Sequence, residues 1–134
     1  MYRVTKIIHF SYGHRLMDYE GKCASLHGHN GRVEITLCAK SLDKRGMVVD
    51  FGDLKRTIEL WVDKNLDHRM ILREDDPLIP NLEKVGEKVF KMKENPTAEN
   101  LARLIFEEVE SLGFPVEEVR FWETESSFAT YRKG

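Results

Sequence analysis

The chain has 134 residues, of which 41% are hydrophobic and 33% are charged; this composition fits one folded domain over residues 1–134 and excludes a disordered chain. Its 21 basic and 23 acidic residues give a net charge of −2, and the basic residues are scattered, which argues against a nucleic-acid partner. No apolar run reaches the roughly 20 residues that span a bilayer, and the N-terminus lacks a signal-peptide pattern, so we expect a cytoplasmic protein without a membrane partner.

Two strands are predicted in the first part of the chain. Residues 4–10 are β-branched and aromatic, which favours a strand. Residues 32–40 alternate between apolar and polar side chains, which is typical of a half-buried strand. Turn-forming residues at 43–46 precede a short apolar segment at 47–49, and this order predicts a hairpin.

Two helices are predicted after these strands. Asp50 is suited to cap a helix that runs to about Lys64, and Thr97 to cap a second helix that Gly113 ends. Apolar residues at helical spacing are expected to face the core: Leu54, Ile58, Trp61 and Val62 in the first helix, and Leu101, Leu104, Ile105, Val109 and Leu112 in the second.

The last part of the chain again favours strands, at residues 116–122 and 128–131. Residues 71–94 contain several helix and strand breakers, and the part 84–93 is compatible with helix, strand or loop. The order of strands, helix, helix and strands predicts an α+β domain, in which a four-stranded antiparallel sheet carries both helices on one face.

Three of the five histidines, His14, His27 and His29, lie within 16 residues of one another. Because residues i and i+2 of an extended chain point to the same side, His27 and His29 are expected to present two imidazoles together. The same parity continues into Val33 and Ile35, so the imidazoles belong to a buried face. Unpaired imidazoles there would be costly, which indicates a metal or a firm hydrogen-bond network.

Two interpretations of this cluster remain open, and they differ in the role of Cys23. In the first, Cys23 joins the three histidines in a closed structural zinc site. In the second, His14, His27 and His29 hold zinc with one open position, and Cys23 stays off the metal as a nucleophile or general base. Cys38 lies on the polar face of its strand and is assigned no role.

Two further features carry carboxylates. Asp67 and His68 are adjacent in a predicted loop; they can form a hydrogen-bonded pair only if the loop turns them together, and a solvated turn is the alternative. Glu123 shares the parity of Val119 and Phe121, where burial is expected. Its carboxylate therefore needs an internal arginine or a ligand with N–H donors, unless it lies at the exposed end of the strand.

Six short blocks are spread along the chain: FSYGHRL at 10–16, CASLHGHN at 23–30, GMVVDF at 46–51, LDH at 66–68, NPTAEN at 95–100 and WET at 122–124. In this order they resemble the blocks of the 6-pyruvoyl-tetrahydropterin synthase family. The three residues between Cys23 and His27 resemble the bacterial branch of that family, the 6-carboxy-5,6,7,8-tetrahydropterin synthases of queuosine biosynthesis.

This resemblance implies a tunnelling fold, in which the sheets of several subunits join side by side into a barrel. It implies a homo-oligomer, commonly a hexamer of two trimers, with active sites between subunits. The implied activity is that of a zinc-dependent lyase, whose small-molecule substrate is 7,8-dihydroneopterin triphosphate. The products would be 6-carboxytetrahydropterin, acetaldehyde and triphosphate.

The resemblance also implies roles for single residues. It assigns zinc binding to His14, His27 and His29, proton abstraction to Cys23, proton relay to Asp67 and His68, the anchoring of the pterin ring to Glu123, and the lining of that pocket to Thr97 and Glu99. Two rival hypotheses are a pyruvoyl-forming enzyme with the same zinc and a non-catalytic zinc-stabilised binding module.

Overall fold

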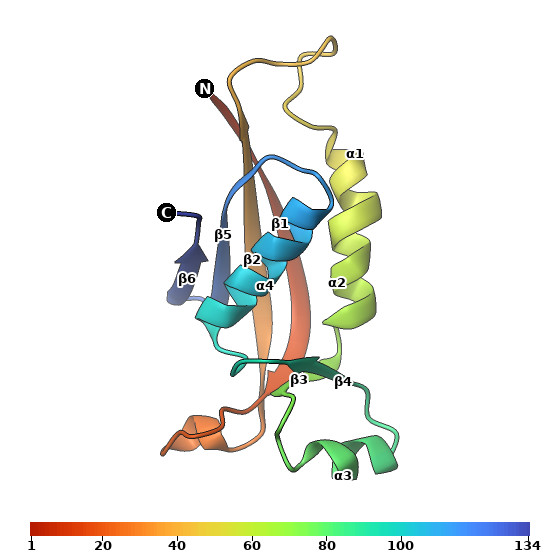
Figure 1. Ribbon diagram of the computed structural model, residues 1–134, viewed down its shortest axis with the longest axis vertical. Helices are drawn as coiled ribbons and strands as arrows, with labels where there is room; N and C mark the ends of the chain where they lie inside the picture. Colours follow the sequence, from red (N-terminus) through yellow and green to blue (C-terminus); the bar gives the residue numbers. More distant parts are fainter.

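The sheet has six strands in the computed structural model, which describes all residues from 1 to 134 (Figure 1). The strand order is β4-β3-β1-β2-β5-β6. The pairs β1–β2, β2–β5 and β5–β6 are antiparallel, whereas β1–β3 and β3–β4 are parallel. The prediction of a four-stranded antiparallel sheet is therefore wrong in strand number and in direction. The bounds are β1 Tyr2–His14, β2 His27–Ala39, β3 Arg69–Arg73, β4 Val89–Met92, β5 Val116–Thr124 and β6 Ser127–Tyr131.

The strands β1 and β2 form the longest ladder, which runs from Tyr2 opposite Ala39 to His14 opposite His27. Both predicted strands are confirmed, and both extend beyond the predicted ends into the histidine segment. On the inner face every second residue is buried, namely Ile8, Phe10, Tyr12 and His14 in β1 and Val33, Ile35 and Leu37 in β2. The histidines therefore continue the face that carries the core.

The first predicted helix is confirmed. It comprises α1 (Phe51–Leu54) and α2 (Leu60–Asn65), joined by five residues with the wider π-type winding at Lys55–Glu59. The Gly52 N–H donates to Asp50 Oδ1 at 2.8 Å, so Asp50 is the expected cap. Its apolar stripe has no exposed surface at Leu54, Ile58 and Val62, while Trp61 is half-buried.

The second predicted helix is also confirmed, as α4 (Ala98–Ser111). The Asn100 N–H donates to Thr97 Oγ1 at 3.1 Å, and Gly113 follows the helix with φ +90°. Leu101 and Ile105 are fully buried. The prediction that Leu112 is buried is wrong, because this residue lies beyond the last helical turn and is 43% exposed.

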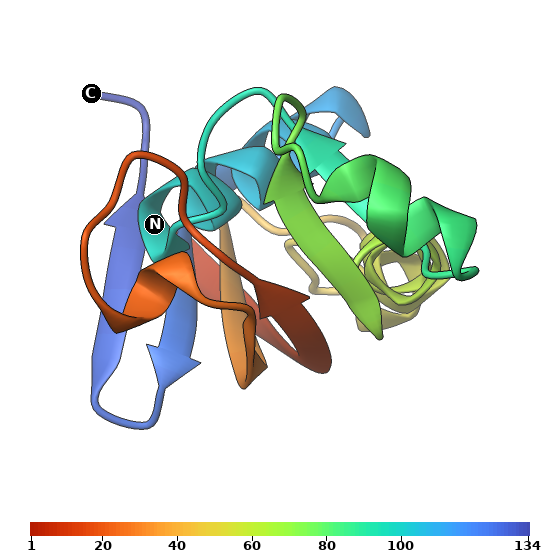
Figure 2. The ribbon, with the colours of Figure 1, turned by 90° about the horizontal axis from the view of Figure 1, so that it is seen from below.

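Both helices cover the same face of the sheet, as expected (Figures 1 and 2). One cluster of 19 buried residues joins the inner sides of both helices to β1, β2 and β5. None of the helices is long and apolar enough to cross a membrane.

The segment that the sequence leaves open, residues 71–94, begins within β3 and contains the short helix α3 (Ile79–Lys84) and the strand β4. β3 pairs with the end of β1 at Tyr12 to His14, so this segment extends the sheet beside the histidines. Neither short strand shows the alternation that marks an antiparallel strand with one exposed face, and weak alternation is typical of parallel strands.

The predicted hairpin at 47–49 is wrong. A turn does form at 43–46, with the Gly46 N–H donating to the Asp43 carbonyl at 3.0 Å. However, the Asp43 side chain accepts hydrogen bonds from the N–H groups of Arg45 and Met47, at 2.8 and 3.1 Å. The turn therefore closes on itself, and Val48 and Val49 pack against the core instead of forming a ladder.

Candidate metal centre and active site

The three histidines converge where β1 ends and β2 begins. The register sets His14 opposite His27 and Tyr12 opposite His29. One ring nitrogen of each histidine lies within 4.8 Å of the others, and the ring centroids of His27 and His29 are 5.0 Å apart. The prediction that His27 and His29 share one face is confirmed.

Backbone carbonyls determine which nitrogens of His14 and His27 carry hydrogen. The Pro96 carbonyl is 2.7 Å from His14 Nδ1, and the Ser25 carbonyl is 2.7 Å from His27 Nδ1. A carbonyl can only accept, so each Nδ1 is the protonated nitrogen of a neutral ring. The two Nε2 atoms, which face each other at 2.9 Å, then both present lone pairs.

Two lone pairs at this distance repel each other unless a cation lies between or beside them. His29 Nε2 is also buried and makes no hydrogen bond, and its nearest charged neighbour is Glu123 Oε1 at 3.4 Å. Outward N–H groups tied to carbonyls are also the usual support of metal-binding imidazoles. The donor set of His14, His27 and His29 therefore fits a divalent metal ion, and neutral imidazoles suit zinc.

Burial favours the neutral form of His14 and of His29. Burial, together with repulsion from His27 and His29, lowers the pKa of His14 to about 4, and only the Pro96 carbonyl opposes this shift. Burial also lowers the pKa of His29, while the carboxylate of Glu123 opposes it. Because a metal binds only a deprotonated ring nitrogen, His14 and His29 are available to a metal at neutral pH.

Cys23 lies outside the cluster. Its thiol is not among the groups that approach one another within 4.8 Å. It is half-buried in a short helical turn at Lys22–Ala24, within the loop from β1 to β2. The structure thus brings the three histidines together without the thiol of Cys23.

Glu123 ends the inner face of β5, after the fully buried Val119 and Phe121. Its side chain is 28% exposed, and Oε1 lies 3.4 Å from His29 Nε2. Its neighbour is thus a histidine of the cluster and not an internal arginine. A carboxylate placed here can also accept hydrogen bonds from a ligand beside the metal centre.

Tyr12 forms part of the wall of the cluster. Its ring lies 5.2 Å from the His14 ring and 5.7 Å from the His29 ring, between centroids. Its hydroxyl is buried without a hydrogen-bond partner, and burial and the nearby Glu123 raise its pKa. The ring fits because position 31 is glycine, where an added Cβ would meet Tyr12 Cε1 at 3.1 Å.

The side chains of Asp67 and His68 lie in direct contact. The distance from Asp67 Oδ2 to His68 Nδ1 is 2.9 Å, and Asp67 Oδ1 accepts from the Ser11 N–H at 3.0 Å. The loop turns them together because His68 has a positive φ of 57°, a conformation that is uncommon outside glycine. His68 is 78% exposed.

A pocket of about 420 Å³ is lined by both His27 and His68, so one cluster histidine and the Asp67–His68 pair border the same space. Gly13 also lines it, and an added Cβ there would collide with the Met70 side chain at 2.5 Å. The structure places Thr97 at the cap of α4 and Glu99 in its first turn, where Glu99 is exposed.

Comparison with known proteins assigns the chain to a family over nearly its whole length. Residues 3–134 match the family described as 6-pyruvoyl tetrahydropterin synthase. The chain belongs to this family.

Relatives and solved structures in the family cover nearly the whole chain. A Rickettsia bellii protein named 6-carboxy-5,6,7,8-tetrahydropterin synthase is 42% identical over 135 residues, which cover 96% of this chain and 98% of that protein. A crystal structure of a Wolinella succinogenes protein aligns with a TM-score of 0.81 at 29% identity, covering 99% and 98% of the two chains. The 6-pyruvoyl tetrahydropterin synthase of Caenorhabditis elegans aligns with a TM-score of 0.74 at 26% identity, covering 99% and 96%.

The sequence did not predict the two backbone carbonyls that orient His14 and His27. The carbonyls of Pro96 and Ser25 leave no trace in side-chain patterns, although the Asn95-Pro96-Thr97 block marks one of them. The sequence does contain a signal for the buried hydroxyl of Tyr12. This tyrosine lies on the buried face of β1, two residues before His14.

Proposed function

We propose that the chain is a zinc-dependent 6-carboxy-5,6,7,8-tetrahydropterin synthase of queuosine biosynthesis. It would convert 7,8-dihydroneopterin triphosphate and one water molecule into 6-carboxytetrahydropterin, acetaldehyde and triphosphate. The observation that carries the proposal is the pair of Nε2 lone pairs on His14 and His27, which converge at 2.9 Å while their Nδ1 groups are held by carbonyls. The name borne by the 42% identical relative supports this choice of reaction.

In this proposal His14, His27 and His29 hold the zinc ion, and Cys23 is not a ligand. Three neutral imidazoles leave a coordination position for the hydroxyls of the substrate side chain. Zinc bound there would supply Lewis-acid chemistry, which acidifies the neighbouring C–H and stabilises the negative charge that develops on oxygen.

The chain's own residues then divide the remaining work. Cys23, as thiolate, takes the proton from the activated carbon, and Asp67 and His68 relay protons. The 2.9 Å contact between Asp67 Oδ2 and His68 Nδ1 supports this role, because the carboxylate orients the imidazole. We place the active sites between subunits of a hexamer of two trimers, so these groups need not all come from one chain.

Glu123 would anchor the pterin. The amino-pyrimidinone edge presents N–H donors, and a partly exposed carboxylate beside His29 can accept two of them. Thr97 and Glu99 would line the same pocket from the start of α4.

The test is incubation of the zinc-loaded protein with dihydroneopterin triphosphate, followed by mass spectrometry of the products. We expect 6-carboxytetrahydropterin and acetaldehyde. A pyruvoyl product without acetaldehyde would contradict the carboxy-forming reaction.

The Cys23→Ala variant separates the enzyme from a non-catalytic zinc-stabilised module. We expect this variant to retain its zinc and lose turnover. Weakened zinc binding and poorer folding would instead indicate that the thiol has a structural role.

A further inference from the structure

The loop of residues 15–26, which connects β1 to β2, carries Cys23 and has few hydrogen bonds of its own. The Leu16 N–H donates to the Cys23 carbonyl at 2.9 Å, which ties the start of the loop to the residue with the thiol. The two other internal bonds, at 3.1 Å each, only close the turn around Cys23. The position of Cys23 therefore depends on what holds the residues next to Leu16.

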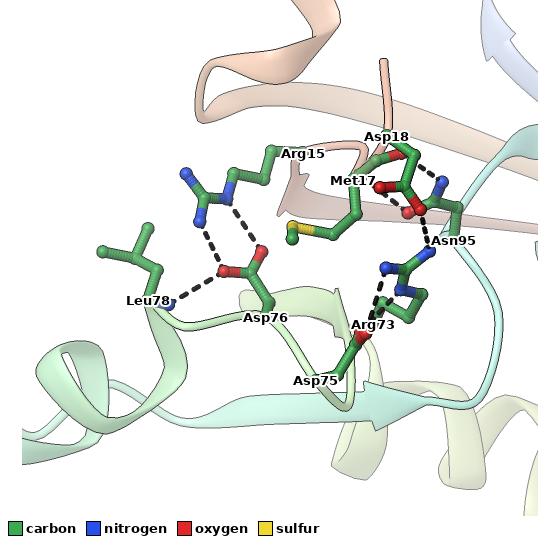
Figure 3. Close-up of polar contacts among 8 residues, drawn as sticks. All are labelled: Arg15, Met17, Asp18, Arg73, Asp75, Asp76, Leu78 and Asn95. Atoms are coloured by element: carbon green, nitrogen blue, oxygen red, sulfur yellow. Dashed lines mark hydrogen bonds and ion pairs between the residues drawn. The ribbon is translucent and has the colours of Figure 1, made fainter.

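Asn95 holds one of these neighbours, Met17, from a segment 78 residues away. The Met17 N–H donates to Asn95 Oδ1 at 2.8 Å, and Asn95 Nδ2 donates to the Met17 carbonyl at 2.7 Å (Figure 3). An amide side chain that satisfies both backbone groups of one residue fixes that residue in position and in orientation.

Asn95 is itself held firmly. Its carbonyl accepts from the Thr97 N–H at 2.8 Å and from Asn100 Nδ2 at 2.9 Å, both at the start of α4. The next residue is Pro96, whose carbonyl accepts from His14 Nδ1 at 2.7 Å. Two consecutive residues thus make both contacts: Asn95 binds the loop that carries Cys23, and Pro96 binds the ring of His14.

Ion pairs hold the loop on either side of Met17 (Figure 3). Arg15 Nε donates to Asp76 Oδ2 at 2.8 Å, and the Asp76 side chain is fully buried. Asp18 accepts from Arg73 Nη1 at 3.0 Å. These pairs limit how far the loop can move, but neither reaches the histidine cluster; the Asn95–Pro96 segment does so through His14.

We propose that Asn95 is a positioning residue that sets the Cys23 loop at a fixed place relative to His14. This inference rests on the proposed roles of Cys23 as base and His14 as zinc ligand. Without the Asn95 amide, His14 keeps its contact to the Pro96 carbonyl, while Met17 and the loop are released. Loss of the Asn95 amide should therefore slow proton abstraction and leave zinc binding unchanged.

The test compares Asn95→Ala with Asn65→Ala in the zinc-loaded protein. Asn65 is a matched control, because its Nδ2 donates to the Trp61 carbonyl within α2, away from the loop. For Asn95→Ala we expect unchanged zinc content, a fall in kcat of about 10- to 100-fold and little change in KM. We also expect alkylation of Cys23 by iodoacetamide, followed on its own peptide, to accelerate roughly 5- to 30-fold. Asn65→Ala should match the wild type in all four.

A loss of zinc in proportion to the loss of kcat, or unchanged kcat and alkylation, would overturn the proposal. Hydrogen exchange of the wild-type protein gives a second test, which does not depend on the folding of a variant. The Met17 amide should exchange its hydrogen more slowly than the amides of Asp18, Tyr19 and Glu20, which have no acceptor. Equal exchange at these positions would overturn it as well. If the wild type shows no turnover, the proposed function fails, whereas zinc content, alkylation and exchange still decide the role of Asn95.

Discussion

The buried ring of His14 makes a specific prediction about stability and pH in the metal-free protein. His14 is 2% exposed, and its pKa is about 4 in the folded chain against about 6.5 in an unfolded one. The unfolded state therefore binds a proton first as the pH falls. Stability from this residue is complete above about pH 6.5, declines as the pH falls to about 4, and changes no further below that value. A difference of about 2.5 pKa units corresponds to about 3 kcal/mol of unfolding free energy.

The assay is urea unfolding of metal-stripped protein between about pH 7 and about pH 4. His14→Gln should remove about 3 kcal/mol of the pH-dependent loss, while contributions of the same sign, such as that of His29, stay in both proteins. His9→Gln, on the exposed side of the same strand, is the matched control and should keep the wild-type profile. If His14→Gln and the wild type lose equal stability over this range, the reasoning about burial is refuted.

Three substitutions test the packing around the site, each by urea unfolding of metal-free protein. Tyr12→Phe removes a buried hydroxyl without a partner and should raise the unfolding free energy by about 1 kcal/mol; a clear decrease would show that the hydroxyl is bonded. Gly31→Ala sets a Cβ 3.1 Å from Tyr12 Cε1 and 3.2 Å from Phe121 Cζ, and should cost about 1 to 3 kcal/mol; a neutral result would contradict this packing. Asp76→Asn leaves the Arg15 guanidinium without its charge partner and should cost about 2 kcal/mol, a figure reduced because Arg15 is 23% exposed; no change would mean that the pair is solvated.

Periodicity predicts the parts of this protein whose partners lie close in the chain or on a regular face. The shared face of His27 and His29 follows from alternation in β2, and both helix caps follow from local residue chemistry. The addition of β3 and β4 does not follow, because short parallel strands pair through distant segments and carry little alternation.

The finer parts of the site depend on contacts that no local pattern encodes. The Asp67–His68 contact requires a positive φ at His68, a backbone conformation that is uncommon outside glycine and that the local sequence does not predict. The hydrogen bond between His14 and the Pro96 carbonyl joins residues that are 82 positions apart in the sequence. The bond between Met17 and Asn95 joins residues that are 78 positions apart. Such pairs become visible only when the β1–β2 register and the start of α4 are both known.

X-ray absorption spectroscopy at the zinc edge of the loaded wild-type protein is the most direct test of the three-histidine metal centre. We expect a shell of nitrogen and oxygen atoms at about 2.0 to 2.1 Å, with imidazole scattering from three rings and no sulfur. A sulfur atom at about 2.3 Å would mean that Cys23 binds the metal, and would contradict both the open site and the thiol's role as base.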